Sequence, residues 1–161
     1  MEKASDKIGI IQKRVLIQAE AGIVYDALTE SRDLIHWFCD RCTSDPRPGG
    51  ELRAFWRAGK NGQRGRGVYV RIEPGSYVEL RWVDDGTGAV EVDEASHVLS
   101  YTIRLRRDST ELLMRDEDAR ALLDGDAAAV FNEGWTSSLL LLKDYCERKQ
   151  RSARRRPDNV R

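Results

Sequence analysis

The sequence predicts a single α+β domain in which one long C-terminal helix covers an antiparallel sheet. Three observations predict this class. The chain has 161 residues, a length that suits one domain with its own core. Apolar and polar residues alternate over much of residues 51–118, as they do in half-buried strands. Residues 127–148 carry apolar side chains at helical spacing instead.

The N-terminal part is predicted to form one strand and two short helices. Apolar residues at even spacing over residues 8–19 indicate a strand with one wet face. Residues 21–28 and 32–38 have apolar residues at helical spacing, so we expect a short helix in each. The Pro- and Gly-rich residues 45–50 are typical of a loop.

Five short strands are predicted between residues 51 and 118. Turn residues separate them, which favours an antiparallel meander, and residues 84–95 form the longest connection. On each strand the alternate apolar residues mark the face that we expect to point inward. These residues are Leu52, Ala54, Trp56, Val68, Val70, Ile72, Val78, Leu80, Trp82, Leu99, Tyr101, Ile103, Leu105, Leu112 and Met114.

The C-terminal third is predicted to be one amphipathic helix over residues 127–148, about 30 Å long. Asp126 is a candidate N-cap. A sheet with one apolar face needs a cover, and only this helix is long enough to provide it. Where a curved sheet and the helix separate, we expect a cavity. The apolar stripe that would face the sheet is Phe131, Trp135, Leu139, Leu142 and Cys146.

The charges are balanced in number but unevenly distributed. The chain has 27 basic and 27 acidic residues, yet residues 148–161 hold seven of the basic residues and one acidic residue. We therefore expect one folded domain over residues 1–147 and a basic, disordered tail over residues 148–161. The tail would add only non-specific attraction to polyanions such as nucleic acid.

Other classes are excluded or disfavoured by simple counts. No apolar run approaches the ~18 residues that a membrane helix requires, so we expect no membrane insertion. The charged N-terminus has no apolar signal core. Three cysteines do not suggest a disulfide framework, so we expect a reducing, cytoplasmic location.

His36, Cys39 and Cys42 form the sharpest local cluster. An imidazole and two thiolates at this spacing are compatible with zinc binding, and a CxxC pair is compatible with redox chemistry. A structural zinc site needs four ligands, however, and no second CxxC pair exists. We favour Cys39 as a small apolar filler and expect neither a metal nor a cofactor.

Candidate catalytic residues are few. The sequence has no GxSxG motif, and Gly65-Arg66-Gly67 lacks the pattern of a phosphate loop. His97 shares the parity of the inward residues and would suit a general base or a ligand-orienting donor. We favour a partly exposed His97 near a strand end. Asp116 shares inward parity too, but we favour a frayed, wet position because a buried charge would need a partner. We expect no catalytic residue and lean against an enzyme.

Residues 52–72 contain no acidic residue and several basic ones, which would form a basic ribbon on a hairpin. Three interpretations remain open: an anionic partner such as nucleic acid, a solvated hairpin that resists edge pairing, or a second subunit that presents its acidic loop. We favour the solvated hairpin. The basic residues are Arg53, Arg57, Lys60, Arg64, Arg66 and Arg71.

Four segments resemble a known superfamily: "RVLIQAEAGIVYDALTESRDLIHWF", "PRPGGELRAF", "GRGVYVRIEPGSYVELRW" and "GWTSSLLLLKDYCE". They are similar to the START-like, helix-grip superfamily (SRPBCC), which includes polyketide cyclases and lipid-transfer domains. The closest resemblance is to the branch of the C-terminal domain of the heat-shock-protein-90 ATPase activator, over about residues 10–147. It implies a curved antiparallel sheet of six to seven strands that grips a long helix around an apolar pocket.

The resemblance implies a non-catalytic module that binds a small hydrophobic ligand between sheet and helix. One alternative is a chaperone-associated, ATPase-stimulating or protein-interaction role, with a chaperone or a second copy as partner. Another is a cyclase- or hydrolase-type enzyme that uses a cavity His or Tyr. Candidate cavity residues are Trp37, Phe38, Trp56, Val70, Trp82, His97, Tyr101, Met114, Phe131, Trp135 and Leu139.

Overall fold

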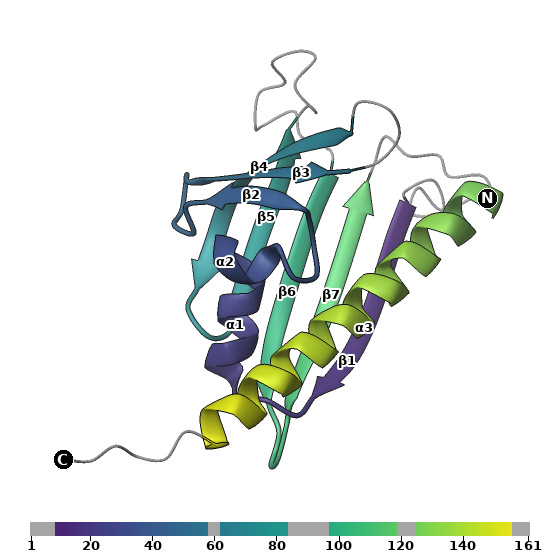
Figure 1. Cartoon of the computed structure of the whole chain (residues 1–161). Coiled ribbons are helices and arrows are strands. Elements are labelled where there is room, and N and C mark those ends of the chain that lie inside the picture. The colour runs from purple at the N-terminus through teal and green to yellow at the C-terminus, as the bar shows by residue number, and fades with distance from the viewer. Residues whose placement is uncertain (1–8, 58–61, 84–96, 119–124, 156–161) are drawn as a thin grey trace.

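The computed structural model describes residues 9–57, 62–83, 97–118 and 125–155, which form a seven-stranded antiparallel sheet with helices on one face (Figure 1). The predicted α+β class and its helix-grip arrangement are confirmed. The predicted acidic loop at residues 84–95 lies outside the described residues. In chain order the elements are β1 (Gly9–Ile17), α1 (Ala21–Thr29), α2 (Ser31–Leu34), β2 (Arg41–Ser44), β3 (Glu51–Trp56), β4 (Gln63–Glu73), β5 (Tyr77–Val83), β6 (His97–Leu105), β7 (Thr110–Asp118) and α3 (Gly125–Arg155).

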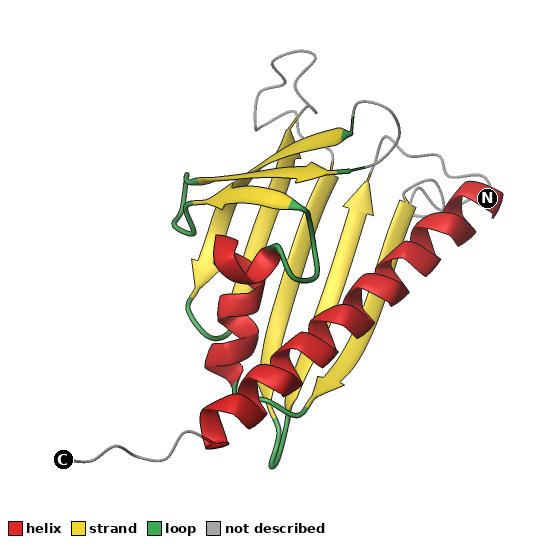
Figure 2. Cartoon of the chain, in the orientation of Figure 1, coloured by secondary structure: helices red, strands yellow, loops and turns green. Residues whose placement is uncertain are grey.

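The sheet is a meander closed by the N-terminal strand. Strands β2 to β7 each pair with the next along the chain, and β1 pairs with β7, so the strand order is β1-β7-β6-β5-β4-β3-β2. Ile17 lies opposite Thr110 and Gly9 lies opposite Asp118. α3 runs obliquely across the sheet and α1 and α2 lie beside it on the same face (Figure 2). The interior between sheet and helices is therefore bounded by segments from both ends of the chain.

β2 is a strand that the sequence analysis did not identify. It has four residues, two of which are exposed, and it pairs with β3 at the edge of the sheet. A strand of this length is too short to show a hydrophobic period. Ser44 fixes β2 against α1, because its hydroxyl donates to the Thr29 carbonyl at 2.5 Å.

α2 is shorter than predicted. It ends at Leu34, and the next residues form a tight turn in which the backbone N–H groups of Phe38 and Cys39 both donate to the Leu34 carbonyl. The apolar residues of this turn made the segment look helical. The turn instead directs Trp37 and Phe38 into the interior.

A bulge in β4 changes which residues of that strand face inward. The pairing with β5 shifts between Tyr69 and Arg71, so Val70 is the extra residue. Tyr69 is fully buried in the core, and Ile72 packs against the core on the far side of the bulge. The predicted inward parity of Val68 and Val70 is wrong, because a bulge breaks the two-residue period and neither valine belongs to the core cluster.

The core lies between the inner face of the sheet and the stripe predicted on the long helix. Trp135, Leu139, Leu142 and Cys146 of α3 are buried, with exposed fractions from 0% to 9%. Burial of each such large apolar side chain contributes roughly 1.5–3 kcal/mol relative to exposure. The stripe is thus confirmed for these four residues, while the side chain of Phe131 lies outside the described part of the chain.

α3 extends beyond both predicted ends. It begins at Gly125, so Asp126 lies in the first turn and not at the N-cap, and it continues to Arg155. The predicted limit between domain and tail, after residue 147, therefore falls inside the helix. Charged Lys and Arg are good helix formers, so basic composition alone did not indicate where the helix ends. Neither α3 nor any other helix in the described ranges is long and apolar enough to span a membrane.

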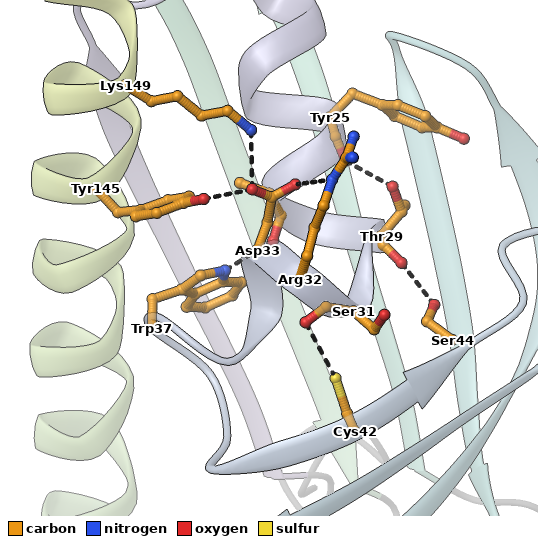
Figure 3. Close-up of polar contacts among 11 residues, drawn as sticks. Tyr25, Thr29, Ser31, Arg32, Asp33, Trp37, Cys42, Ser44, Tyr145 and Lys149 are labelled. Atoms are coloured by element: carbon orange, nitrogen blue, oxygen red, sulfur yellow. Dashed lines mark hydrogen bonds and ion pairs between the residues drawn. The ribbon is translucent and has the colours of Figure 1, made fainter. Parts of the chain in front are cut away.

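A buried carboxylate on α2 holds the last turns of α3. Asp33 is 1% exposed and accepts hydrogen bonds from the Tyr145 hydroxyl and, at 2.8 Å, from Lys149 Nζ (Figure 3). Beside it, the buried side-chain oxygen of Gln150 accepts the backbone N–H of Glu20 at 2.8 Å. Residues beyond 147 are therefore anchored to the body. We name the contacts of Asp33 with Tyr145 and Lys149 the Asp33 clasp.

Candidate ligand-binding site

Aromatic side chains from α3, from two strand ends and from the turn after α2 gather inside the fold. Phe38 is at the centre: its ring centroid lies 5.3 Å from those of Trp37 and Trp56, 6.2 Å from Trp82 and 6.5 Å from Trp135. Trp82 stacks on Phe38 and Trp56 meets it edge-on. We name these five residues the aromatic cluster.

Hydrogen bonds fix three of the four indoles in the aromatic cluster. Trp37 donates to the Ala27 carbonyl at 2.7 Å, Trp56 donates to the Phe38 carbonyl, and Trp135 donates to Asp116 Oδ2 at 2.7 Å. A buried indole N–H needs an acceptor, so each bond also selects one ring orientation. Three of the four indole rings in the aromatic cluster are therefore held in one orientation.

Two glycines of β4 provide the space for the indoles. A Cβ added to Gly65 would lie 3.0 Å from Trp56 Cζ3 and 3.2 Å from Trp82 Cζ3, and one added to Gly67 would lie 3.3 Å from Trp82 Cε3. A side chain at either position would force the rings to shift by a few tenths of an ångström. The two-residue spacing of the glycines within a strand was the available signal, but the sequence analysis considered them only as a phosphate loop.

A polar pair, Asp116 and His97, borders the aromatic cluster. Asp116 of β7 is 3% exposed; one of its oxygens accepts the Trp135 indole N–H and the other lies 2.5 Å from His97 Nε2. The expectation of a frayed, wet Asp116 is wrong, because partners on α3 and β6 bind both oxygens. His97 is the first residue of β6 and partly exposed, as predicted, and its ring centroid is 6.4 Å from that of Trp82.

Of the remaining predicted cavity residues, three lie in the core cluster and Val70 lies outside it. Tyr101, Met114 and Leu139 are each 2% exposed and belong to the core cluster. Burial, and then the charge of Asp116, raise the pKa of Tyr101 well above its usual value, so its hydroxyl stays protonated. Val70 is outside the core cluster because of the β4 bulge.

Sequence reasoning missed two polar features of this interior. Asp116 was assigned to solvent, and Tyr69, whose hydroxyl lies 2.7 Å from Ser44 Oγ, was not considered. Both residues depend on contacts between segments that are distant along the chain. The only sequence signal for either contact was the inward parity of Asp116.

The predicted His36, Cys39 and Cys42 cluster does not converge on one point. His36 stacks on Tyr145 of α3 at 4.9 Å between ring centroids, whereas the two thiols face carbonyls of α2. Across the part of the chain that the structure describes, no three His, Cys, Asp or Glu side chains are placed to hold a metal ion.

Half of the basic ribbon is paired with acidic residues at its borders. Glu51, just before the acid-free stretch, binds Arg53 at 3.0 Å and Arg66 at 2.5 Å, and Glu73, just after it, binds Arg71 at 3.2 Å. These contacts fit the solvated-hairpin interpretation better than a nucleic-acid surface. Lys60 lies outside the described residues.

A groove of 460 Å³ lies at the opposite end of β6 from His97. Its floor includes Leu105, which is 77% exposed although the sequence predicted it to point inward. Leu105 is the last residue of β6 and extends past the cover of the helices. The lining residues are Gln18, Ala19, Glu20, Ala21, Leu105, Arg106, Arg107, Asp108, Ser109, Thr110 and Arg154.

A seven-stranded meander that grips a long helix, with a polar pair inside an aromatic interior, defines a START-like protein of the SRPBCC superfamily. The match of a family model narrows this class further. The chain belongs to the family described as "Activator of Hsp90 ATPase homolog 1-like protein", whose model matches residues 18–147. No curated protein sequence matches it.

Solved structures with the same fold include the Aha1 dimer from Colwellia psychrerythraea, with 20% identity and a TM-score of 0.68, covering 86% of this chain and 96% of that one. Protein NE0264 from Nitrosomonas europaea has 17% identity and a TM-score of 0.71, covering 88% and 96%. DynU16, from the dynemicin biosynthetic locus, has 20% identity and a TM-score of 0.70; the match covers 88% of this chain but 48% of DynU16. At these identities the likeness shows the fold alone.

Proposed function

We propose that this protein binds a small hydrophobic ligand between the sheet and α3, at the aromatic cluster, without a covalent step. One observation carries the proposal: a buried carboxylate, with a hydrogen bond to each oxygen, and a partly exposed imidazole adjoin aromatic rings that are held in fixed orientations. A core that served stability alone would not need a buried charge, because burying one is costly.

The chemistry of the walls specifies the class of ligand. Flat or acyl apolar groups would pack on Phe38 and Trp82, with a gain of about 25 cal/mol for each Å² of apolar surface buried. One polar group on the ligand would be oriented by His97, which is partly exposed on the side of Trp82. The proposed ligand is therefore apolar with a single hydrogen-bonding end.

Thermal melting with a panel of aromatic and acyl compounds tests the proposal, together with native mass spectrometry of the purified protein for a copurified ligand. A ligand should raise the Tm by mass action. Trp82→Ala should remove that rise, whereas Leu141→Ala, on the exposed face of α3, should keep it. Asp116→Asn should weaken binding of ligands with a polar end more than that of purely apolar ones. The absence of any bound mass and of any Tm shift across the panel would reject the proposal.

A second candidate function is suggested by the family description, which refers to an activator of the Hsp90 ATPase. In this function the protein would bind the chaperone and stimulate its ATPase. The test is the ATPase rate of Hsp90 at stoichiometric amounts of this protein, and an unchanged rate would exclude it. Light scattering would test self-association, since a structural neighbour is described as a dimer. The three free cysteines support a cytoplasmic location for either function.

A further inference from the structure

Two cysteines occupy the short connection between α2 and β2. Cys39 follows the turn that ends α2, and Cys42 is the second residue of β2. Cys39 Sγ lies 3.9 Å from the Leu34 carbonyl oxygen. Cys42 Sγ lies 3.6 Å from the Ser31 carbonyl oxygen (Figure 3). Both thiols therefore face the same four-residue helix.

The carbonyl groups that the two thiols face lie one helical turn apart, because Ser31 and Leu34 are three residues apart on α2. The interaction with Cys42, and then burial, raise the pKa of Cys39, and the interaction with Cys39 lowers the pKa of Cys42. Thiols that face carbonyl groups one turn apart on the same helix need only side-chain rotations to meet. The pair thus differs from cysteines that are merely close in sequence, for which backbone geometry commonly forbids a bridge.

We propose that Cys39 and Cys42 form a reversible intramolecular disulfide by exchange with a small-molecule disulfide such as glutathione disulfide. The structure assigns different parts to the two residues. Cys42 is half-buried and can meet an external disulfide, whereas Cys39 is 7% exposed and can react only from inside. Cys42 is therefore the attacking thiol and Cys39 the resolving thiol.

The exchange balances in two steps. The Cys42 thiolate attacks one sulfur of glutathione disulfide, forms a mixed disulfide and releases one glutathione thiolate. In the mixed disulfide Cys42 no longer makes the interaction that raises the pKa of Cys39 most, so Cys39 can lose its proton to solvent. The Cys39 thiolate then attacks the sulfur of Cys42 and releases the second glutathione. The protein gives up two electrons and two protons, and glutathione disulfide is reduced to two molecules of glutathione.

The third cysteine is a built-in control. Cys146 is completely buried on α3, and burial raises its pKa to about 12, so it holds its proton at neutral pH. Because its sulfur is out of reach of an external disulfide, Cys146 should take no part in the exchange.

The pair also adjoins the aromatic cluster, because Phe38 directly precedes Cys39 along the chain. A disulfide would restrain the turn that carries Phe38 and would change the fluorescence of the neighbouring indoles. An effect of oxidation on ligand binding would rest on the proposed function, but formation of the disulfide does not.

The experiment equilibrates the purified protein with glutathione buffers from fully reduced to mostly oxidised, then alkylates the unfolded chain with N-ethylmaleimide and measures its intact mass. The fully reduced protein should take three labels. The oxidised protein should take one label, at Cys146, and carry no bound glutathione. Before labelling, its mass should be two hydrogens lower than that of the reduced protein. Dithiothreitol should restore all three labels.

Single variants assign the roles. Cys39→Ser should stop at one glutathione on Cys42, Cys42→Ser should take up none, and Cys146→Ser should behave as the wild type. Circular dichroism of each variant verifies folding, and the wild-type mass alone decides the matter if a variant does not fold. Three labels in the most oxidised buffer, a mixed disulfide that persists on the wild type, or a bridge between two chains would each overturn the proposal. None of these results depends on a hydrophobic ligand.

Discussion

At the scale of the residue, Gly65 is the position where the sequence most directly shapes the candidate site. A Cβ there would lie within 3.2 Å of both the Trp56 and Trp82 rings, and Trp56 cannot yield because its indole is bonded to the Phe38 carbonyl. Gly65→Ala should therefore destabilise the fold by about 1–3 kcal/mol and shift the tryptophan fluorescence. Urea unfolding measures the stability.

Gly22 gives the matched control for this change. No atom lies within 4 Å of a Cβ added to Gly22, which is in α1. Gly22→Ala should leave the fluorescence unchanged and stabilise the protein by roughly 0.5–1 kcal/mol. If the two substitutions act alike, the rings do not depend on the bare β4 backbone.

Individual residues also show where sequence reasoning stops. The parity of Asp116 pointed inward correctly, but its burial depends on Trp135, a partner that no local pattern reveals. The predicted inward orientation of Val70 was wrong for a different reason. One extra residue in β4 inverts the face of every residue beyond it. The aromatic residues were easier to predict because their size alone favours the interior.

At the scale of the element, α3 contains one replaceable weakness. Gly134 lies within the helix, is exposed, and has no atom within 4 Å of an added Cβ. Glycine in a helix interior is about 1 kcal/mol less favourable than alanine. Gly134→Ala should raise the free energy of unfolding by about that amount in urea titrations. A loss of stability would mean that this face of α3 contacts another part of the chain.

The hairpin of β6 and β7 should make stability sensitive to acid. Hydrogen bonds from Arg106, aided by the charges of Arg14 and Arg104, lower the pKa of Glu111 below its ordinary value of 4.5. A carboxyl whose pKa is lower in the folded state stabilises the fold above its unfolded pKa, and this contribution is lost as pH falls through the folded value. Thermal melts should therefore lose stability below pH 4.5, and Glu111→Gln should flatten this dependence. An equally steep loss in the variant would assign the effect to other carboxyls.

At the scale of the whole molecule, periodicity predicted the order of elements but not all of their neighbours. The switch from a two-residue to a helical period separates the meander from α3, and the resemblance supplied the number of strands. The place of β1 beside β7 is a pairing across the whole chain, which no local pattern specifies. β2 is too short to show a period and is positioned by its contact with α1. Long elements were thus predictable, whereas short ones depend on the rest of the fold.

The true end of the domain can be tested by truncation. The sequence predicted a disordered tail from residue 148 onward, but Lys149 binds buried Asp33 and Gln150 binds the Glu20 backbone. A chain that ends at residue 147 leaves Asp33 with Tyr145 and the exposed Arg32, 4.0 Å away, but without Lys149. Removing one partner of a buried polar group costs about 1–3 kcal/mol. We expect a lower Tm and urea midpoint for this chain, and Lys149→Met in the full chain should reproduce most of the loss. A chain that ends at residue 155 keeps both contacts and should match the full chain; if the shorter chain is equally stable, the Asp33 clasp does not hold α3.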